Sequence, residues 1–405
     1  MLTNGNILRL YVCLVFLYLH TSFARGYLLE YDKAIIEDAQ LKTHELIRKY
    51  GLKAEVHKVY TKDGFVLTAH RIPRPGGQPV LLLHGLEDSS ATWVMMGPEQ
   101  GLGYLLFERG YDVWMLNSRG NTYSRKHLRL HPFMSQFWDF SFHEVGIYDL
   151  TASIDYVLGK TNFKKLHYIG HSQGTTSFLA LGSDRPAYMK KIKAMHALAP
   201  PAFFDNLGSP IAKALAPYAR SIYTLLKIIG IHEIPVESEV WRRLIYQICS
   251  FAFRNTCTFL FFFVNGGNEA QLNVTMTPII AAHAPAGSSA KSIAHYAQLY
   301  HSGGFYKYNY DTPGENRRRH GTFKAPEYNL TNVDCKMALY YAKNDLVVAV
   351  KDVQRLRSIL PNVVHDELIA YEKFSHVDFV WAIDARSLLY ESLLDVMQRV
   401  DNGEL

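Results

Sequence analysis

Short apolar runs alternate with amphipathic stretches over two separate parts of the chain. Strand-like runs of this kind are bounded by glycine or polar turn residues, which is typical of buried parallel strands. Residues 143–159 carry apolar side chains at helical spacing, and residues 56–72 predict a hairpin around Asp63-Gly64. The pattern therefore predicts an α/β fold with a mostly parallel sheet. The predicted strands lie at 80–85, 111–120, 166–170, 194–198, 337–341 and 367–371.

The alternation stops between residues 203 and 325. This stretch is rich in helix formers, aromatic residues and small residues, and it contains the most apolar run after the N-terminal segment, TFLFFFV at 258–264. We expect an inserted, mainly helical unit, called the cap segment below. The sequence then divides into 25–202 as the first part of the core, 203–325 as the cap segment and 326–405 as the second part of the core.

The N-terminus has the pattern of a secretory signal peptide. One charge, Arg9, precedes ten apolar residues at 10–19, and the small residues Ser22 and Ala24 follow. Ten helical residues rise only about 15 Å, which is too short to span a bilayer. We expect residues 1–24 to be removed and the protein to be secreted. A buried helix or an uncleaved anchor is the alternative.

Composition narrows the functional class. The net charge is only +6 and the basic residues are spread along the chain, which argues against nucleic-acid binding. No run reaches the ~18 apolar residues of a spanning helix. Aromatic residues make up 13% of the chain, with 26 Tyr and 22 Phe, which favours a large core or an apolar ligand. The sequence has no metal-ligand spacing, dinucleotide glycine motif or P-loop, so no metal or cofactor is expected.

Three cysteines remain once Cys13 leaves with the signal. In an oxidising compartment we expect a disulfide between Cys249 and Cys257, with Cys335 free in a strand. A straight helix across 249–257 would hold those sulfurs about 12 Å apart and forbid the bond. Two N-x-[ST] sequons, at Asn273 and Asn329, are the expected glycosylation sites.

The candidate nucleophile is Ser172, in the pentapeptide Gly170-His171-Ser172-Gln173-Gly174. A strand-like run precedes the pentapeptide and a helix-like run follows it, which is the context of a nucleophile elbow. In such an elbow, glycines allow the sharp turn while the hydroxyl points outward. An ordinary strand-to-helix turn is the alternative.

The expected oxyanion hole consists of the backbone N–H groups of Leu86 and Gln173. Leu86 lies in the loop after the strand at 80–85, and Gln173 directly follows the nucleophile. Such donors stabilise the charge that develops on the tetrahedral intermediate. The neighbouring His84 is interpreted as a hydrogen-bonded structural histidine rather than a base.

Chain order and position select the partners of Ser172. The acid is expected before the histidine in sequence, and both at the C-terminal ends of strands. Asp345 follows the strand at 337–341, and His376 follows the last strand candidate. The rival acids Asp334 and Asp366 are expected to precede strands, and Asp378 follows the histidine.

Five segments together resemble the acid lipases, the family of gastric and lysosomal acid lipase. The match runs from about residue 30 to 395 and is carried by HGLEDSSATW, LNSRGNTYS, LHYIGHSQGTTSFLA, YYAKNDLVV and FSHVDFVWAIDA. The resemblance implies an α/β-hydrolase core with a helical cap, hydrolysis of triacylglycerol or cholesteryl esters, and the roles given above for Ser172, Asp345, His376, Leu86 and Gln173. One departure concerns the disulfide: gastric-type members have another cap cysteine near the position of Val240, so Cys249 lacks that partner.

The expected activity is acyl transfer to water through an acyl-enzyme on Ser172. The expected partner is a lipid surface, without a transmembrane span, and a lysosomal lumen is the alternative to the extracellular space. A soluble carboxylesterase or thioesterase with the same triad, and a non-catalytic lipid-binding protein, are the other functional classes. The run Arg317-Arg318-Arg319 is expected in a solvated loop. The oligomeric state stays open.

Overall fold

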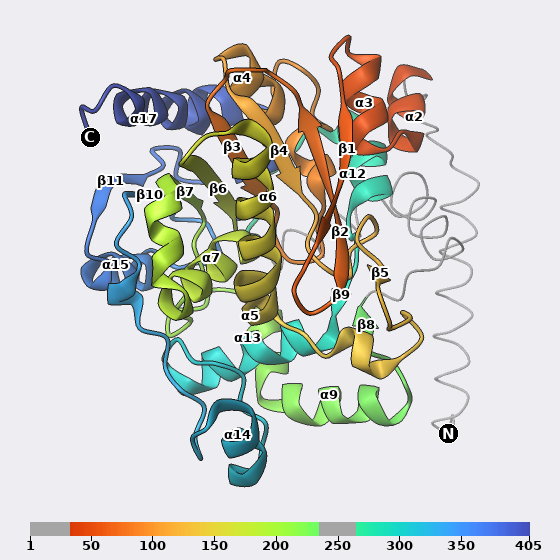
Figure 1. Ribbon diagram of the computed structural model, residues 1–405, viewed down its shortest axis with the longest axis vertical. Coiled ribbons are helices and arrows are strands. Elements are labelled where there is room, and N and C mark those ends of the chain that lie inside the picture. Colours follow the sequence, from red (N-terminus) through yellow and green to blue (C-terminus); the bar gives the residue numbers. More distant parts are fainter. Residues whose placement is uncertain (1–32, 235–264) are drawn as a thin grey trace, which may run out of the picture.

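The computed structural model describes residues 33–234 and 265–405 (Figure 1). Several expectations concern residues outside these ranges and are not addressed by the structure. They are the signal peptide at 1–24, the apolar run at 258–264, Cys249, Cys257 and Val240.

A mixed sheet forms the centre of the molecule, with strand order β1-β2-β4-β3-β6-β7-β10-β11 and the short β5 paired to β2. The strands from β4 to β11 along this order are parallel to one another, while β1 and β5 pair with β2, and β2 with β4, in antiparallel fashion. The predicted α/β class with a mostly parallel sheet is confirmed. The bounds are β1 Glu55–Tyr60, β2 Phe65–Ile72, β3 Pro79–Leu83, β4 Asp112–Leu116, β5 Lys126–His127, β6 Leu166–His171, β7 Ile192–Leu198, β10 Met337–Tyr341 and β11 Val363–Leu368.

One strand begins earlier than predicted. The sequence analysis placed the last strand at 367–371, but β11 spans Val363–Leu368. This strand lies at the sheet edge and carries three consecutive polar residues, His365 to Glu367, so a search for a continuous apolar run misses its first half. Asp366 therefore lies within the strand rather than before it.

Helices connect the parallel strands, and β3 lies between β4 and β6 in the sheet. From β3 the chain passes through α4 to β4 on one edge of β3, and from β4 it passes through α6 to β6 on the opposite edge of β3. Right-handed crossovers therefore place α4 on the opposite face from α6 and α7. The core helices are α2 Lys33–Gln40, α3 Thr43–Lys49, α4 Leu102–Glu108, α5 Phe142–Glu144, α6 Thr151–Thr161, α7 Gln173–Asp184, α15 Val350–Ile359, α16 Asp378–Trp381 and α17 Glu391–Asp401.

The helix predicted at 143–159 is present, as α5 and α6 joined by a π-helical stretch at Val145–Leu150. Ser141 starts it with a capping box, because its hydroxyl accepts from the His143 N–H and Glu144 reaches back to the Ser141 N–H at 2.7 Å. Gly146 lets this helix approach α7 closely, since a Cβ there would lie 2.4 Å from the Ser177 carbonyl oxygen.

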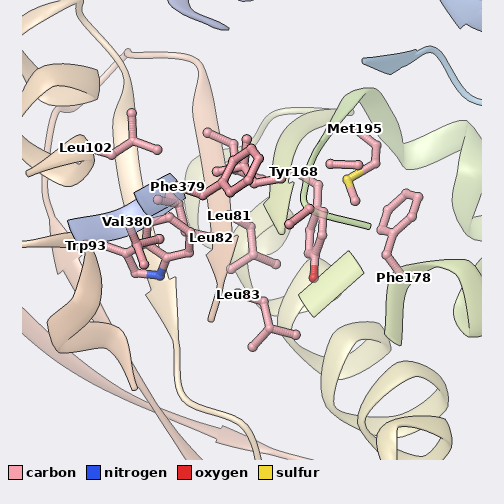
Figure 2. Packing of buried hydrophobic residues seen from close by; sticks show 14 of the residues in the cluster. Leu81, Leu82, Leu83, Trp93, Leu102, Tyr168, Phe178, Met195, Phe379 and Val380 are labelled. Atoms are coloured by element: carbon pink, nitrogen blue, oxygen red, sulfur yellow. The ribbon is translucent and has the colours of Figure 1, made fainter. Parts of the chain in front are cut away.

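The hydrophobic core fills the space between the sheet and its helices. All five residues of β3, β4 and β10 are buried, which explains their continuous apolar runs. Figure 2 shows the ring of Phe178 of α7 to the side of Tyr168 of β6, and their ring centroids are 4.7 Å apart. This packing fixes α7 against the end of β6, where Ser172 lies.

The described part of the cap segment is mainly helical. Its helices are α8 Pro210–Leu215, α9 Ala219–Ile228, α12 Thr277–His283, α13 Ala290–Ser302 and α14 Pro313–His320. One short antiparallel pair, β8 Glu233–Ile234 with β9 Ser288–Ser289, was not predicted, because two-residue strands give no periodic signal.

The arginine run lies in a helix and not in the expected loop. Arg317, Arg318 and Arg319 are exposed residues of α14, which begins after Thr312 as N-cap, with Pro313 in its first turn. Glu315 forms ion pairs with Arg318 and Arg319 along the helix. The expectation of a solvated run is correct and the expectation of a loop is wrong.

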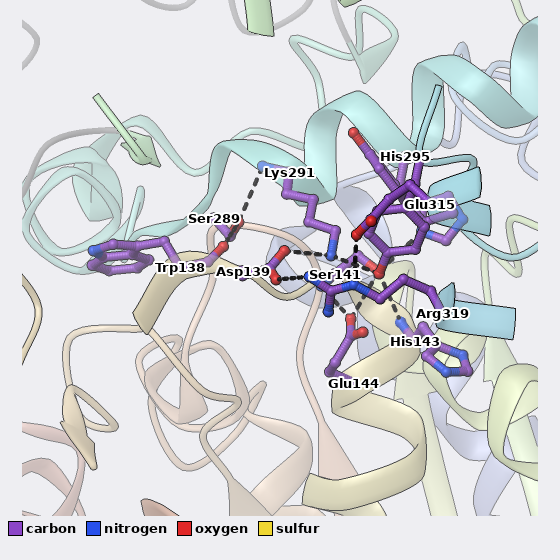
Figure 3. Close-up of polar contacts among 12 residues, drawn as sticks. Trp138, Asp139, Ser141, His143, Glu144, Ser289, Lys291, His295, Glu315 and Arg319 are labelled. Carbon is purple, nitrogen blue, oxygen red and sulfur yellow. Dashed lines mark hydrogen bonds and ion pairs between the residues drawn. The ribbon is translucent and has the colours of Figure 1, made fainter. Parts of the chain in front are cut away.

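A buried polar cluster joins α13 to the loop before α5 (Figure 3). The Lys291 ammonium, in a side chain only 2% exposed, lies 2.7 Å from Asp139 Oδ1 and donates to the Tyr310 hydroxyl. Nearby, His295 Nδ1 and Ser141 Oγ are 3.0 Å apart, and the Ser289 hydroxyl donates to the Trp138 carbonyl. The cap segment is thus tied to the core through polar side chains as well as apolar packing.

Across 33–234 and 265–405, no helix has the length and apolar character needed to cross a membrane.

Candidate active site

Ser172 occupies a strained turn between β6 and α7. Its φ of 48° lies in the left-handed region, which is rare for a residue with a side chain and recurs at functional turns. Two glycines make the turn sterically feasible. A Cβ on Gly170 would lie 2.8 Å from the Gly174 carbonyl carbon, and one on Gly174 would lie 2.2 Å from the Leu83 carbonyl oxygen. The spacing of the pentapeptide therefore has a direct steric reason.

The structure brings Ser172, His376 and Asp345 together at the C-terminal side of the sheet. Ser172 Oγ is 2.9 Å from His376 Nε2, and His376 Nδ1 is 2.8 Å from Asp345 Oδ2. Asp345 Oδ1 accepts the N–H groups of Val347 and Val348 at 2.8 and 2.7 Å. With Nδ1–H donated to the carboxylate, Nε2 is free to accept the serine proton. All three residues are buried.

The three other aspartates considered as the acid of the triad have other partners or positions. Asp334 is exposed ahead of β10, and Asp366 forms an ion pair with Arg357 Nε at 2.7 Å. Asp378 is buried and accepts from the Ser375 N–H and from Asn268 Nδ2, both at 2.6 Å. It holds the turn that carries His376, whereas the imidazole bonds to Asp345.

The expected oxyanion donors flank the serine. Leu86 follows β3 in the loop Gly85–Leu86, and Gln173 begins α7. Among the residues that the structure describes, no acceptor is paired with the N–H of Leu86 or of Gln173. The first N–H groups of a helix have no partner within the helix, so the amide of Gln173 is available to a substrate oxygen.

His84 is a hydrogen-bonded structural histidine, as expected. Its Nδ1–H donates to the Gly85 carbonyl at 2.8 Å, and its Nε2 accepts from the N–H of Ser118 and the amide of Asn121, each at 3.2 Å. Burial lowers the pKa of His84 to about 4, so the ring is neutral near neutral pH.

His171 is a residue of the site whose role the sequence did not reveal. Its Nε2–H donates to the backbone carbonyl of His376 at 2.9 Å, and the two ring centroids are 5.1 Å apart. Burial lowers the pKa of His171 to about 3, which keeps the ring neutral. His171, the second residue of the pentapeptide, therefore fixes the backbone of the loop that carries His376. Only the polar character of this residue hinted at such a contact.

A segment at 265–268 connects the loops of Asp345 and His376. The Asn265 carbonyl accepts from the His376 N–H at 3.2 Å, and the side chain of Asn344 donates to the Gly267 carbonyl at 2.9 Å. Gly266 permits this approach, because a Cβ there would lie 2.1 Å from the Asn344 carbonyl oxygen. The sequence placed these residues in the cap segment and gave no sign of this contact.

A cavity of about 770 Å³ opens onto Ser172 and His376. Leu86 lies on its wall beside the serine, and α8, α9 and α13 supply much of the rest of the lining. That lining is largely aliphatic and aromatic, as expected for a site that receives a hydrocarbon chain. Its side chains include Leu207, Ala212, Ile222, Leu226, Ile280, Ile293, Tyr296, Val380 and Trp381.

The remaining candidate residues lie away from the site. Cys335 is buried and free, as expected, but it lies two residues before β10 and not in a strand. Asn273 and Asn329 each accept a hydrogen bond from the threonine hydroxyl of their own sequon, at 2.6 and 2.7 Å, and Asn329 is exposed. Over the described ranges, no group of three or more His, Cys, Asp and Glu side chains is arranged to hold a metal ion.

Two family models match the chain. The model described as alpha/beta hydrolase fold matches residues 78–225, and the model described as partial alpha/beta-hydrolase lipase region matches residues 43–97. The first range contains the elbow serine and both expected oxyanion donors.

Similar proteins extend the match over nearly the whole chain. Lipase 1 of Drosophila melanogaster is 42% identical over 92% of this chain and 83% of its own length. Lysosomal acid lipase/cholesteryl ester hydrolase of Macaca fascicularis is 33% identical over 97% of this chain and 98% of its own. A crystal structure from Burkholderia cenocepacia, described as a candidate aryl esterase, has a TM-score of 0.51 at 16% identity. It covers 86% of this chain and 100% of its own, and it supports the fold alone.

Proposed function

The chain belongs to the lipase family that includes the gastric and lysosomal acid lipases, and it is a lipid ester hydrolase of the α/β-hydrolase fold; on this premise we propose that it hydrolyses neutral lipids through an acyl-enzyme on Ser172. The proposed substrates are triacylglycerols, cholesteryl esters or both. The observation that carries the proposal is the hydrogen-bonded chain from Ser172 through His376 to Asp345, opening into an apolar cavity.

In the proposed mechanism, His376 Nε2 takes the Ser172 proton as Oγ attacks the ester carbonyl. The backbone N–H groups of Leu86 and Gln173 hold the oxyanion of the tetrahedral intermediate. The imidazolium then protonates the leaving alkoxide, and a water molecule attacks the acyl-enzyme with His376 again as base. Asp345 keeps Nδ1 protonated and stabilises the imidazolium throughout. Every step uses side chains and backbone of this chain, so no cofactor is required.

The apolar surface near the cavity supports contact with a lipid surface. Helix α8 lines the cavity through Ala212 and α9 lines it through Ile222 and Leu226, and this part of the chain also exposes apolar side chains to the outside. A helix with apolar residues on both sides is suited to guide a lipid from an interface into the site. The exposed members are Leu215, Tyr218, Leu225, Ile228 and Ile229.

The proposed organisation keeps residues 203–325 as a cap inserted between two parts of the core, 25–202 and 326–405. We propose that residues 1–24 direct secretion, with the lysosomal lumen as the alternative destination, since the relatives include gastric and lysosomal lipases. Asn273 and Asn329 are the proposed glycosylation sites, and Cys249–Cys257 the proposed disulfide.

Hydrolysis assays test the proposal. The purified protein should release oleate from emulsified triolein or cholesteryl oleate between pH 4 and 9, faster than it hydrolyses a soluble short-chain ester. Hydrolysis restricted to the soluble ester would instead indicate a carboxylesterase.

The triad is tested by substitution. Ser172→Ala should lower turnover at least ~10³-fold while leaving the protein folded. Asp345→Asn should also lower turnover strongly, because the amide allows the wrong imidazole tautomer. Asp366→Asn, whose carboxylate is paired with Arg357, is the matched control and should change turnover far less. A tenth of wild-type activity in Ser172→Ala would exclude it as the nucleophile.

A further inference from the structure

Two neighbouring carboxyl groups lie on the wall of the otherwise apolar cavity. Glu87 and Asp88 directly follow Leu86, the proposed oxyanion donor, and both line the cavity that contains Ser172. No lysine or arginine is found among the described residues of the lining. Carboxyl groups in such surroundings are costly unless they find a partner, so each requires an explanation.

Asp88 has its partners within the protein. Its Oδ1 accepts the Ser89 N–H at 2.7 Å, and the Thr92 side chain forms a second hydrogen bond with it. Glu87 differs: over 33–234 and 265–405, no hydrogen bond or ion pair reaches its carboxyl group, although the residue is half-buried. Loss of water alone raises the pKa of Glu87 to about 7.

The backbone holds Glu87 in a fixed position. Its φ of 59° is in the left-handed region, where a residue with a side chain is disfavoured by about 1–2 kcal/mol relative to the right-handed helical region. Its carbonyl accepts the N–H of Ala286, next to the cavity-lining Ala284 and Pro285 of the cap segment. The direction of this side chain is therefore set by a strained turn that the cap segment holds from outside.

We propose that Glu87 is a specificity-determining residue that binds a free hydroxyl group on the alcohol part of the substrate. Within the proposed class of neutral lipids, this favours a partial glyceride, a mono- or diacylglycerol, over triacylglycerols and cholesteryl esters, whose alcohol part carries no free hydroxyl. The inference rests on the proposed function, because it assigns a substrate to the same serine site.

The chemistry of neutral lipid esters decides which part of the substrate reaches Glu87. The acyl chain is a hydrocarbon and offers no hydrogen bond, so the free polar groups are on the alcohol. In a partial glyceride they lie within a few bonds of the ester oxygen, and Glu87 lies one residue from the donor that holds the ester carbonyl. A protonated carboxyl group both donates and accepts, as a hydroxyl does, so the two groups satisfy one another.

The test compares two oleate esters that differ only in the alcohol: 1-monooleoylglycerol, with two free hydroxyls, and methyl oleate, with none. Values of kcat/KM are measured in the same detergent micelles for the wild type, Glu87→Leu and Glu87→Gln. Glu87→Leu should lower the ratio for monooleoylglycerol over methyl oleate at least ~5-fold, as expected for one lost hydrogen bond. Glu87→Gln keeps donor and acceptor and should change the ratio less than about 2-fold.

Asp88→Asn is the matched control, because its carboxyl group is already held by Ser89 and Thr92. Its ratio should stay within about 2-fold of the wild type, as expected where no substrate hydrogen bond is lost. Glu87→Leu should fold, since it removes an unpartnered carboxyl from an apolar wall, and its melting temperature is recorded alongside.

Three outcomes would overturn the inference. One is an unchanged ratio in Glu87→Leu with both esters hydrolysed. Another is an equal loss in Glu87→Gln, which would show that charge is recognised, as for a cationic headgroup. The third is an equal loss in Asp88→Asn. A wild type that releases no oleate from emulsified triolein, cholesteryl oleate or either test ester would contradict the proposed function itself, so the two failures are distinguishable.

Discussion

At the scale of single residues, burial of Asp88 couples stability to pH. Burial raises the pKa of Asp88 to about 7, against hydrogen bonds from Ser89 and Thr92 that lower it. The ordinary value in an unfolded chain is about 3.9. A carboxyl group whose pKa is higher in the folded state stabilises the fold below its unfolded pKa. That contribution is lost as the pH rises through the folded pKa.

Asp88→Asn removes this titration, because an amide stays neutral. Between pH 5 and pH 8 the wild type should lose roughly 2–3 kcal/mol of unfolding free energy relative to Asp88→Asn. Urea unfolding of both proteins at the two pH values measures the difference. Glu99→Gln, at an exposed position, is the control and should follow the wild type at both. A wild-type-to-variant difference that is the same at pH 5 and pH 8 would show that Asp88 is ionised throughout.

Some residues of the candidate site could be identified from the sequence, and others could not. Ser172, His376 and Asp345 each follow a strand in a recognisable order, so motif and position were enough to select them. The hydrogen bond from His171 to the His376 carbonyl joins the end of β6 to a loop 205 residues further along the chain. Whether the Glu87 carboxyl has a hydrogen-bond partner depends on which side chains the fold brings next to it. Contacts of this kind have no periodic or local signal, so the sequence could not predict them.

At the scale of elements, fully buried strands were the easiest to locate. β3, β4 and β10 are apolar throughout because both faces are covered. The half-buried edge strand β11 was displaced by four residues at its start, and the two-residue pair of β8 and β9 was missed. Thr312 and Gly321 are the N-cap and C-cap residues of α14, and both types favour helix ends. The run of three arginines was nevertheless interpreted as a solvated loop, so the helix was not predicted.

Helix α9 offers a test of lipid contact that leaves the cavity intact. Leu225 and Ile228 are 57% and 77% exposed and do not line the cavity, whereas Ile222 and Leu226 do. Leu225→Ser with Ile228→Ser should lower hydrolysis of emulsified triolein several-fold, because apolar area that would enter the lipid surface is lost. Hydrolysis of a soluble short-chain ester should stay within about 2-fold, since the cavity wall is unaltered.

Leu128→Ser is the control for this comparison. Leu128 is 65% exposed and lies beside the short strand β5, away from the cavity lining. Leu128→Ser should leave hydrolysis of emulsified triolein and of the soluble ester at the wild-type rates. If the α9 variant lowered both activities in parallel, the helix would act on the cavity and not on the lipid surface.

At the scale of the whole molecule, the attachment of the cap segment to the core determines the shape of the cavity. α13 contributes Ala290, Ile293 and Tyr296 to the lining, and Lys291 of the same helix is buried against the core loop at 139–144. Although burial alone would raise it, the pKa of Glu144 is lowered to about 2, chiefly by the charge of Lys291. The charges of the buried Lys291 and the half-buried Glu144 therefore depend on one another across the boundary between cap segment and core.

Breaking this pair should loosen the cavity as well as the fold. Lys291→Met leaves the half-buried Glu144 without its main counter-charge, which should cost up to about 3–5 kcal/mol, the value for a fully buried pair. Glu144→Gln alone should cost less, because Lys291 keeps Asp139 at 2.7 Å. The double variant removes both charges, so it should be less destabilised than the sum of the two changes, by at least ~1 kcal/mol in a double-mutant cycle.

Because α13 lines the cavity, Lys291→Met should also lower kcat/KM on soluble and emulsified esters alike, unlike the α9 variant. Additive free energies with unchanged kinetics would show that the cap segment is held by its apolar contacts and that the buried pair contributes nothing to the site.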